Sequence, residues 1–118
     1  MTEEQKRAIY EYMYEELKGK VWHLVPGSCS ACGLPWTEAR YTTRAQGRDL
    51  DTWMSLPPLD MNTAFALAIP KLQAEGVKVM WNNMGGEWWF DPPSEAAEVI
   101  QTPDFWPGVL DYIKAVHP

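Results

Sequence analysis

The residues best suited to chemistry are two cysteines, Cys29 and Cys32, which form a Cys-x-x-Cys motif followed by Gly33. Two thiolates at this spacing can hold one tetrahedral ion, and His23 lies six residues upstream as a third candidate ligand. The chain has no second Cys-x-x-Cys motif, and the other histidine, His117, is at the far end. The motif therefore predicts a structural zinc site at His23, Cys29 and Cys32 as one of three interpretations.

Two other interpretations of the cysteines stay open. Free cysteine packs as a small hydrophobic residue, so both thiols can lack a metal altogether. A redox pair would need a helix that begins at Cys29 and lowers the pKa of its thiol. Pro35 and the absence of a βαβ pattern disfavour such a helix. No cofactor other than zinc is expected, and a zinc site shared between two copies of the chain would complete the ligand set.

The motifs of common enzymes are absent from the sequence. Gly85-Gly86 has neither the lysine nor the helix that a phosphate-binding loop requires after its glycines. No Gly-x-Ser-x-Gly segment occurs. Ser28 and Ser30 flank Cys29 without an identifiable catalytic partner. We therefore expect a binding protein rather than an enzyme.

Three arginines, Arg40, Arg44 and Arg48, recur every four residues and would share one face of a helix. Arginines bind phosphates, and aromatic side chains stack on bases. These residues are a candidate site for a nucleotide-like ligand. Their alternative interpretation is a solvated helix face.

Composition limits the class of partner. The 118-residue chain has a formal net charge of −6, and its basic residues are scattered. An acidic chain without a basic stripe disfavours double-stranded nucleic acid and anionic membranes. Seven Trp, five Tyr and three Phe can fill a compact core, or some of them can form a binding surface. The charge also suits a basic protein partner.

Periodicity predicts a single domain over 1–118. Helices are expected over 2–18, from about 60 to 75, 94–101 and from 107 onward, strands over 20–25, 77–82 and 87–91, and a long irregular segment over about 26–58. Thr2 and Gln5 form a capping box, and Pro70 should kink or split the middle helix. The order of elements predicts an α+β fold, in which hairpin 77–91 and strand 20–25 form a small antiparallel sheet between helices.

The hairpin 77–91 also defines a candidate binding surface. Alternation places Val79 and Trp81 on one face, and Met80 on the other with Trp89 of the return strand. If one face is open, Met80 and Trp89 lie on it.

The amino-terminal segment is polar, and no apolar run of about 18 residues is present. We therefore expect a cytoplasmic protein with thiols that start reduced.

The order of short motifs resembles a group of small uncharacterised bacteriophage and prophage proteins, the phage ABA-sandwich group. The matching segments are Trp22-His23, 29–33, 60–64, the 77–91 hairpin and Ala96-Ala97 onward. The resemblance implies a sheet between helical layers and, for a phage-encoded chain, the host cytoplasm. It implies no activity.

Our hypothesis is a non-enzymatic binding protein that engages a host or viral protein through an aromatic-rich surface. The alternative is a small-molecule binder, such as a sponge for a nucleotide immune signal. Self-association is a further expectation.

Overall fold

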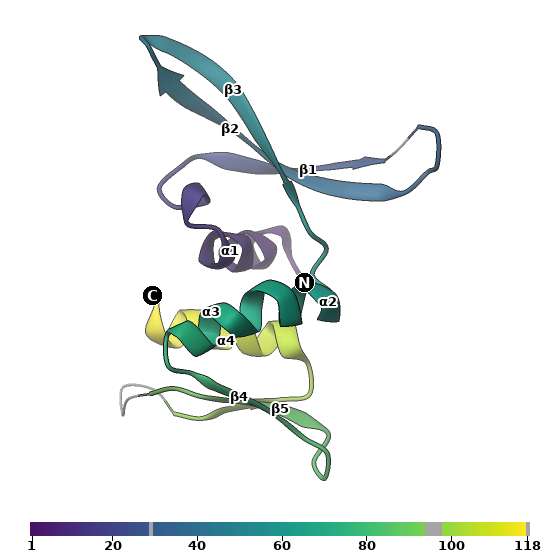
Figure 1. Cartoon of the computed structure of the whole chain (residues 1–118), viewed down its shortest axis with the longest axis vertical. Helices are drawn as coiled ribbons and strands as arrows, with labels where there is room; N and C mark the ends of the chain where they lie inside the picture. Colours follow the sequence, from purple (N-terminus) through teal and green to yellow (C-terminus); the bar gives the residue numbers. More distant parts are fainter. Residues whose placement is uncertain (29, 94–97, 118) are drawn as a thin grey trace. The chain divides into compact units, whose positions relative to one another are not determined.

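The computed structural model describes residues 1–28, 30–93 and 98–117. Contacts divide the chain into two compact units, Met1–Pro58 and Leu59–Pro118, and each is described by itself. Both units combine helices with a three-stranded antiparallel sheet, so the α+β class is confirmed (Figure 1). The expected single sheet is wrong, because the strand near residues 20–25 and the 77–91 hairpin belong to different sheets. No helix in the described ranges is long and apolar enough to cross a membrane.

The first unit consists of a helix, a short 3₁₀ turn and a β-meander. Its elements are α1 (Glu3–Met13), η1 (Glu15–Leu17), β1 (Trp22–Ser28), β2 (Pro35–Ala45) and β3 (Arg48–Leu56). The predicted capping box begins α1: the Thr2 hydroxyl accepts from the Gln5 N–H at 3.2 Å, and the Gln5 side chain accepts from the Thr2 N–H at 2.9 Å. The strands follow the order β1-β2-β3 (Figure 1).

The expectation of an irregular segment over 26–58 is wrong for most of its length. Strand β1 continues through Pro26 and Gly27 to Ser28, and a long hairpin of β2 and β3 follows. Pro26 and Gly27 are tolerated because β1 is an edge strand. The hairpin turns at Gln46 and Gly47, whose φ angles of 52° and 75° are those of a two-residue type I′ turn.

One face of this sheet packs on α1. Trp22, Ala39 and Leu56 lie on that face and are buried. The Trp22 indole N–H donates to Glu11 of α1 at 2.8 Å, and the Tyr10 hydroxyl donates to the carbonyl of Pro57 at 2.6 Å. These contacts fix the helix beneath the sheet and leave the opposite face without a cover from within the unit (Figure 1).

The second unit has three sequential helical segments, a three-stranded sheet and a final helix. Its elements are α2 (Met61–Thr63), η2 (Ala64–Ala68), α3 (Ile69–Ala74), β4 (Lys78–Asn82), β5 (Glu87–Asp91), β6 (Ile100–Thr102) and α4 (Phe105–Val116). The hairpin over 77–91 is confirmed. A helix was expected over 94–101, and its first part, 94–97, lies outside the described residues. At Ile100 and Gln101 the prediction is wrong, because these residues belong to β6, which pairs with β5. The last helix begins at Phe105, two residues before Pro107.

Pro70 changes the hydrogen bonding of the middle helix without breaking its path. The Asp60 side chain caps the start by accepting from the Thr63 N–H at 2.9 Å. Proline has no N–H to continue the α-helical ladder. The preceding turn is a π-helix, in which the Ile69 N–H donates to the Ala64 carbonyl five residues back. The helix is therefore divided by hydrogen-bond pattern, as the proline predicted.

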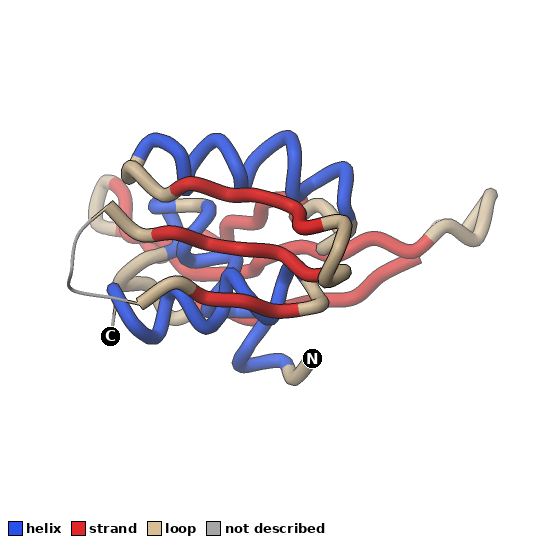
Figure 2. The backbone as a smooth tube through the Cα atoms, turned by 90° about the horizontal axis from the view of Figure 1, so that it is seen from below, coloured by secondary structure: helices blue, strands red, loops and turns tan. Residues whose placement is uncertain are grey.

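The core of the second unit forms where α4 crosses β5 and β6. Phe90 is fully buried and contacts Phe105, with ring centroids 5.5 Å apart. Gly108 of α4 lies so close to the sheet that an added Cβ would be 2.3 Å from the Phe90 ring and 2.5 Å from the Thr102 methyl. Only glycine allows this approach. Figure 2 shows the three strands of this sheet side by side, and no described helix of this unit covers their other face.

Two buried tyrosines make stability sensitive to alkaline pH. Burial, with a contribution from Tyr14, raises the pKa of Tyr10 to about 12. Burial, then the hydrogen bond from its hydroxyl to Glu75 and the charge of Glu75, raises the pKa of Tyr112 to about 12. Folding therefore favours the neutral phenols. Their contribution is complete below the ordinary pKa of 10.0 and is lost as pH rises toward about 12.

We expect Tyr10 and Tyr112 to ionise late in a titration of the folded chain, at about pH 12 instead of 10.0. A spectrophotometric titration of the tyrosinate band, followed alongside far-ultraviolet circular dichroism, measures this. Replacing Tyr112 with Phe should remove one late transition and make stability less dependent on pH between about 10 and about 12. An unchanged titration curve for that variant would contradict the assignment.

Candidate recognition face

The open face of the first sheet holds two exposed tryptophans. Strand register places Trp36 and Arg40 of β2 on one face with Trp53 of β3 and His23 of β1, opposite the face that packs on α1. Trp36 is 47% exposed and Trp53 is 60% exposed. His23, Arg40 and Trp53 form one row across the three strands, because Arg40 pairs with both of the others. We call this surface the meander face.

An ion pair lies at the centre of the meander face. The Arg40 guanidinium donates to Oε1 of Glu38 through Nε at 2.8 Å, and its Nη2 is also 2.8 Å from that oxygen. The Glu38 side chain is 11% exposed, whereas that of Arg40 is 62% exposed. The carboxylate is therefore held under the arginine, and most of the guanidinium remains open to a partner.

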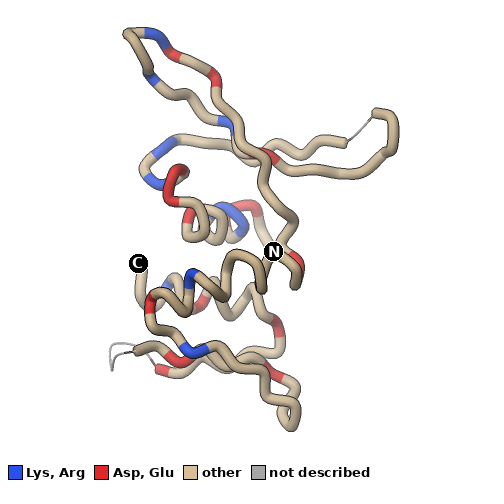
Figure 3. Tube along the Cα trace, viewed as in Figure 1, with Lys and Arg blue, Asp and Glu red and all other residues tan. Residues whose placement is uncertain are grey.

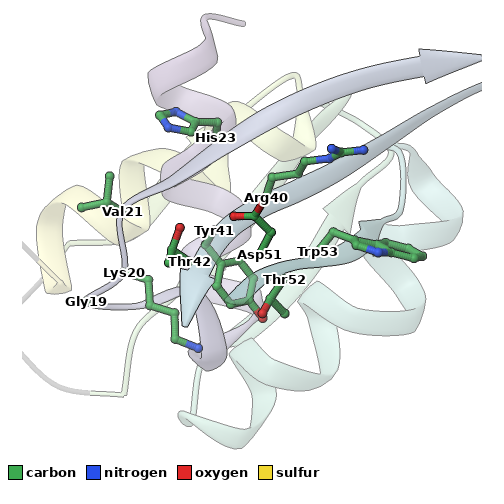
Figure 4. Close-up of a pocket in the computed structure, with 10 residues that line it drawn as sticks. All are labelled: Gly19, Lys20, Val21, His23, Arg40, Tyr41, Thr42, Asp51, Thr52 and Trp53. Carbon is green, nitrogen blue, oxygen red and sulfur yellow. The ribbon is translucent and has the colours of Figure 1, made fainter. Parts of the chain in front are cut away.

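A hollow of about 570 Å³ borders this row (Figure 4). It forms where the chain turns into β1 beside the β2–β3 ribbon, and its lining residues are Gly19, Lys20, Val21, His23, Arg40, Tyr41, Thr42, Asp51, Thr52 and Trp53. The Lys20 ammonium lies 4.6 Å from the Tyr41 ring centroid, a cation–π contact. None of the ten lining residues is buried, so the hollow is open to water along its length.

Trp36 is held in place by a glycine on the neighbouring strand. Gly27 pairs with Trp36, and a Cβ at Gly27 would be 2.4 Å from the indole. The ring therefore lies directly over the glycine backbone, where it covers a site that carries no side chain. This contact orients an exposed indole that would otherwise sample several rotamers.

Gly27→Ala should displace the Trp36 indole at little cost to the fold. The clash is with an exposed side chain that can rotate away, so we expect a loss of less than about 1 kcal/mol. Near-ultraviolet circular dichroism and acrylamide quenching of tryptophan fluorescence should both change. The Gly27→Ala/Trp36→Phe double variant is the control, because the alanine should then have little spectral effect. A Gly27→Ala spectrum identical to wild type would refute the contact.

The structure places His23 near the start of β1 and Cys32 in the turn that follows the end of this strand. His23 is the second residue of β1, and five residue steps of extended strand, about 16 Å, lead from it to Ser28 at the end of the strand. Cys32 is exposed in the turn beyond, and Cys29 lies outside the described residues. Among the described residues, no three His, Cys, Asp or Glu side chains are grouped to hold a metal. The interpretations of Cys29 stay predictions, while His23 instead joins Arg40 on the meander face.

The three arginines lie on strands, so the helical alignment considered from their spacing does not occur. Arg40 and Arg44 share the meander face, and Arg48 lies across the turn on the opposite face. Arg44 is 3.9 Å from Asp49 and largely exposed. Figure 3 shows charges of both signs along this ribbon.

Met80 and Trp89 are cross-strand partners on the face of the second sheet opposite the buried Phe90. Met80 is 45% exposed, and the Trp89 indole N–H donates to Glu87 at 3.1 Å. Trp81, which is exposed like Trp36 and Trp53, lies on the helix-facing side of this sheet. Its indole packs against that of Trp88, with the ring centroids 5.3 Å apart.

Sequence reasoning missed Trp36, Trp53, Lys20, Thr42 and Asp51 as members of one site. The available signal was the run of Trp, Thr and Tyr on both sides of Gln46-Gly47, which is typical of a hairpin. Comparison with protein-family models, with curated proteins and with solved structures gave no match.

Proposed function

We propose that the chain is a non-enzymatic binding protein that recognises a partner protein through the meander face. The observation that carries this is the pair of exposed indoles, Trp36 and Trp53, on the same sheet face as the open Arg40 guanidinium. Tryptophan and arginine are enriched among residues that dominate binding energy at protein interfaces. The partner class follows the sequence resemblance: a host or viral protein.

The openness of the hollow favours a protein partner. Sites for small molecules bury most of the ligand surface, usually 70–90%. A hollow without one buried lining residue cannot enclose a ligand in this way, whereas a protein partner brings its own surface to complete the enclosure. The charge distribution also suits a protein partner. The first unit has seven basic and eight acidic residues, whereas the second unit has three basic and eight acidic residues. The meander face thus belongs to the nearly neutral part of an acidic chain.

Affinity capture with three baits tests the proposal. Wild-type chain, the Trp36→Ala/Trp53→Ala variant and the matched Met80→Ala/Trp89→Ala variant are each used on bacterial lysate, with the tag at either end. A partner that is recovered by the wild type and the second variant, and lost from the first, supports the meander face. A partner retained by the first variant and lost from the second would place recognition on the second sheet instead.

A second candidate function is binding of a nucleotide-like ligand, favoured by one observation. Trp53 offers a stacking surface beside Arg40, with Lys20 in the same hollow, a combination that suits an aromatic ring and a phosphate. Thermal-shift measurements with cyclic dinucleotides and ADP-ribose derivatives test it, because a ligand that binds the folded state raises its melting temperature. No shift at millimolar ligand would eliminate this candidate.

A further inference from the structure

Strand β3 is an edge strand along its whole length. The sheet order is β1-β2-β3, so β2 pairs with one side of β3, and no strand of the described first unit pairs with the other side. Packing within the described residues agrees, because β2 is the element with which β3 makes its extensive contacts. An edge of this kind presents unpaired N–H and C=O groups, which can pair with another chain.

The turn geometry shows which backbone groups of β3 point outward. In a two-residue hairpin, the residues that flank the turn, here Ala45 and Arg48, exchange both backbone hydrogen bonds. Along an antiparallel ladder, pairs that exchange hydrogen bonds then alternate with pairs that do not. The register runs from Arg48 to Leu56 without a bulge. Four residues of β3 therefore direct their N–H and C=O groups away from β2: Asp49, Asp51, Trp53 and Ser55.

These four outward-directed residues are accessible. Within the described part of the chain, none of them makes a backbone hydrogen bond to another segment. All four residues are exposed, and the Asp49 side chain is 70% exposed. The outer edge of β3 can therefore accept a further strand.

The side chains along this edge define the strand that would fit. Alternation places Asp49, Asp51 and Trp53 together on the meander face. A residue of an added antiparallel strand that lies opposite Asp51 would have Asp49 and Trp53 as diagonal neighbours. An arginine at this position can form a bidentate ion pair with Asp51 and stack on the Trp53 indole. On the other face, the exposed Leu50 offers an apolar contact to the next residue of that strand.

We propose that an extended segment of the partner protein adds to the outer edge of β3 as a further antiparallel strand, with an arginine opposite Asp51. This inference rests on the proposed function and specifies its mode: backbone pairing supplies affinity, and the arginine sets the register. A basic segment also complements the formal net charge of −6 of the whole chain.

A defined peptide tests the inference. The probe is a heptapeptide with blocked ends, Val-Thr-Thr-Arg-Val-Thr-Thr, and its counterpart has Gln in place of Arg. We expect the Arg peptide to slow amide hydrogen exchange at Asp51 and Trp53, and to leave it unchanged at Leu50 and Thr52, which already bond to β2. It should bind about threefold or more tightly than the Gln peptide. Absence of binding by the Arg peptide at millimolar concentration would overturn the inference.

Methylation of the peptide backbone separates edge pairing from contact through side chains alone. With the arginine opposite Asp51, the arginine N–H points toward β3, and the N–H of the following valine points away. N-methylation at the arginine should weaken binding about tenfold or more, and N-methylation at the valine by less than about threefold. Equal losses from the two modifications would overturn the inference.

Asp51→Asn tests the charged contact from the side of the chain. This variant should lose most of the preference for the Arg peptide over the Gln peptide. Asp111→Asn is the control, because it removes an equal charge from an exposed position of the second unit and should leave the preference unchanged. A preference that survives Asp51→Asn would overturn the inference. Protection of the Asp51 and Trp53 amides that grows with the concentration of the chain alone would identify a second copy as the occupant and overturn it as well.

An identified partner distinguishes this inference from the proposed function. Asp51→Pro removes an outward donor and places a ring on the outer edge of β3, while slow exchange at Leu50 and Thr52 reports an intact hairpin. If Trp36→Ala/Trp53→Ala weakens the partner and Asp51→Pro does not, the meander face binds without edge pairing and the inference fails. If only Asp51→Pro weakens it, edge pairing holds and the role of the indoles is wrong.

Discussion

Gly108→Ala is expected to destabilise the chain by about 2–3 kcal/mol, the cost of forcing an extra methyl group into a packed core. The new Cβ would be 2.3 Å from Phe90 and 2.5 Å from Thr102, both of them buried. A destabilisation of about 2–3 kcal/mol corresponds to a fall of roughly 8 °C or more in melting temperature, which thermal unfolding followed by circular dichroism will measure.

The sign of this effect is informative because helix propensity predicts the opposite. In a helix interior, alanine is favoured over glycine by about 1 kcal/mol. A stabilised Gly108→Ala variant would therefore contradict the close packing of α4 on the sheet. Lys114→Ala, at an exposed position of the same helix, is the control and should change stability by less than about 0.5 kcal/mol. Adding Thr102→Ser to Gly108→Ala removes one clashing methyl group and should restore part of the loss.

Trp36→Ala/Trp53→Ala should weaken the captured partner by about a hundredfold or more. Truncating a central tryptophan at an interface commonly costs 2 kcal/mol or above, which is about thirtyfold, and the two losses need not add. Both indoles are about half exposed and neither contributes to the buried core, so the variant should keep its melting temperature. Isothermal titration calorimetry with the purified partner measures the change.

Matched controls make the second prediction specific. Met80→Ala/Trp89→Ala removes a cross-strand apolar pair from the other sheet and should change affinity less than about threefold. If both double variants lose affinity equally, the partner does not discriminate between the two surfaces. That result would contradict the assignment to the meander face.

Local signals predicted the parts of the fold that local interactions determine. The Thr2 and Gln5 capping box begins α1 as expected, because both partners lie within one turn. The hairpin over 77–91 has clean alternation of apolar residues and four turn residues between its strands. Pro70 predicted the change in helical hydrogen bonding, because proline has no N–H to donate.

The β2–β3 hairpin was not predictable in the same way. Much of its ribbon is exposed on both faces, so alternation of apolar and polar residues is weak from Thr42 to Asp51. Its turn has glutamine, a residue that rarely adopts positive φ, at the first central position. Without that hairpin, the strand near residues 20–25 had no evident partner, and it was assigned to the wrong sheet.

The candidate site depended on the missed hairpin. His23 and Arg40 are seventeen positions apart in sequence, and strand register alone makes them neighbours. The spacing of four between Arg40 and Arg44 places them on one face in a strand as well as in a helix. Arg48 departs from that face because the two-residue turn intervenes. The arginine pattern therefore identified part of the surface through an incorrect secondary structure.

Fluorine NMR of chain labelled with 5-fluorotryptophan tests recognition by the meander face most directly, because each of the seven indoles reports separately and no interface residue is changed. Resonances are assigned by single Trp→Phe variants. On addition of the purified partner, the account predicts that the Trp36 and Trp53 resonances shift or broaden, while those of Trp81 and Trp89 stay where they are. Perturbation of Trp81 or Trp89, with Trp36 and Trp53 unchanged, would contradict it.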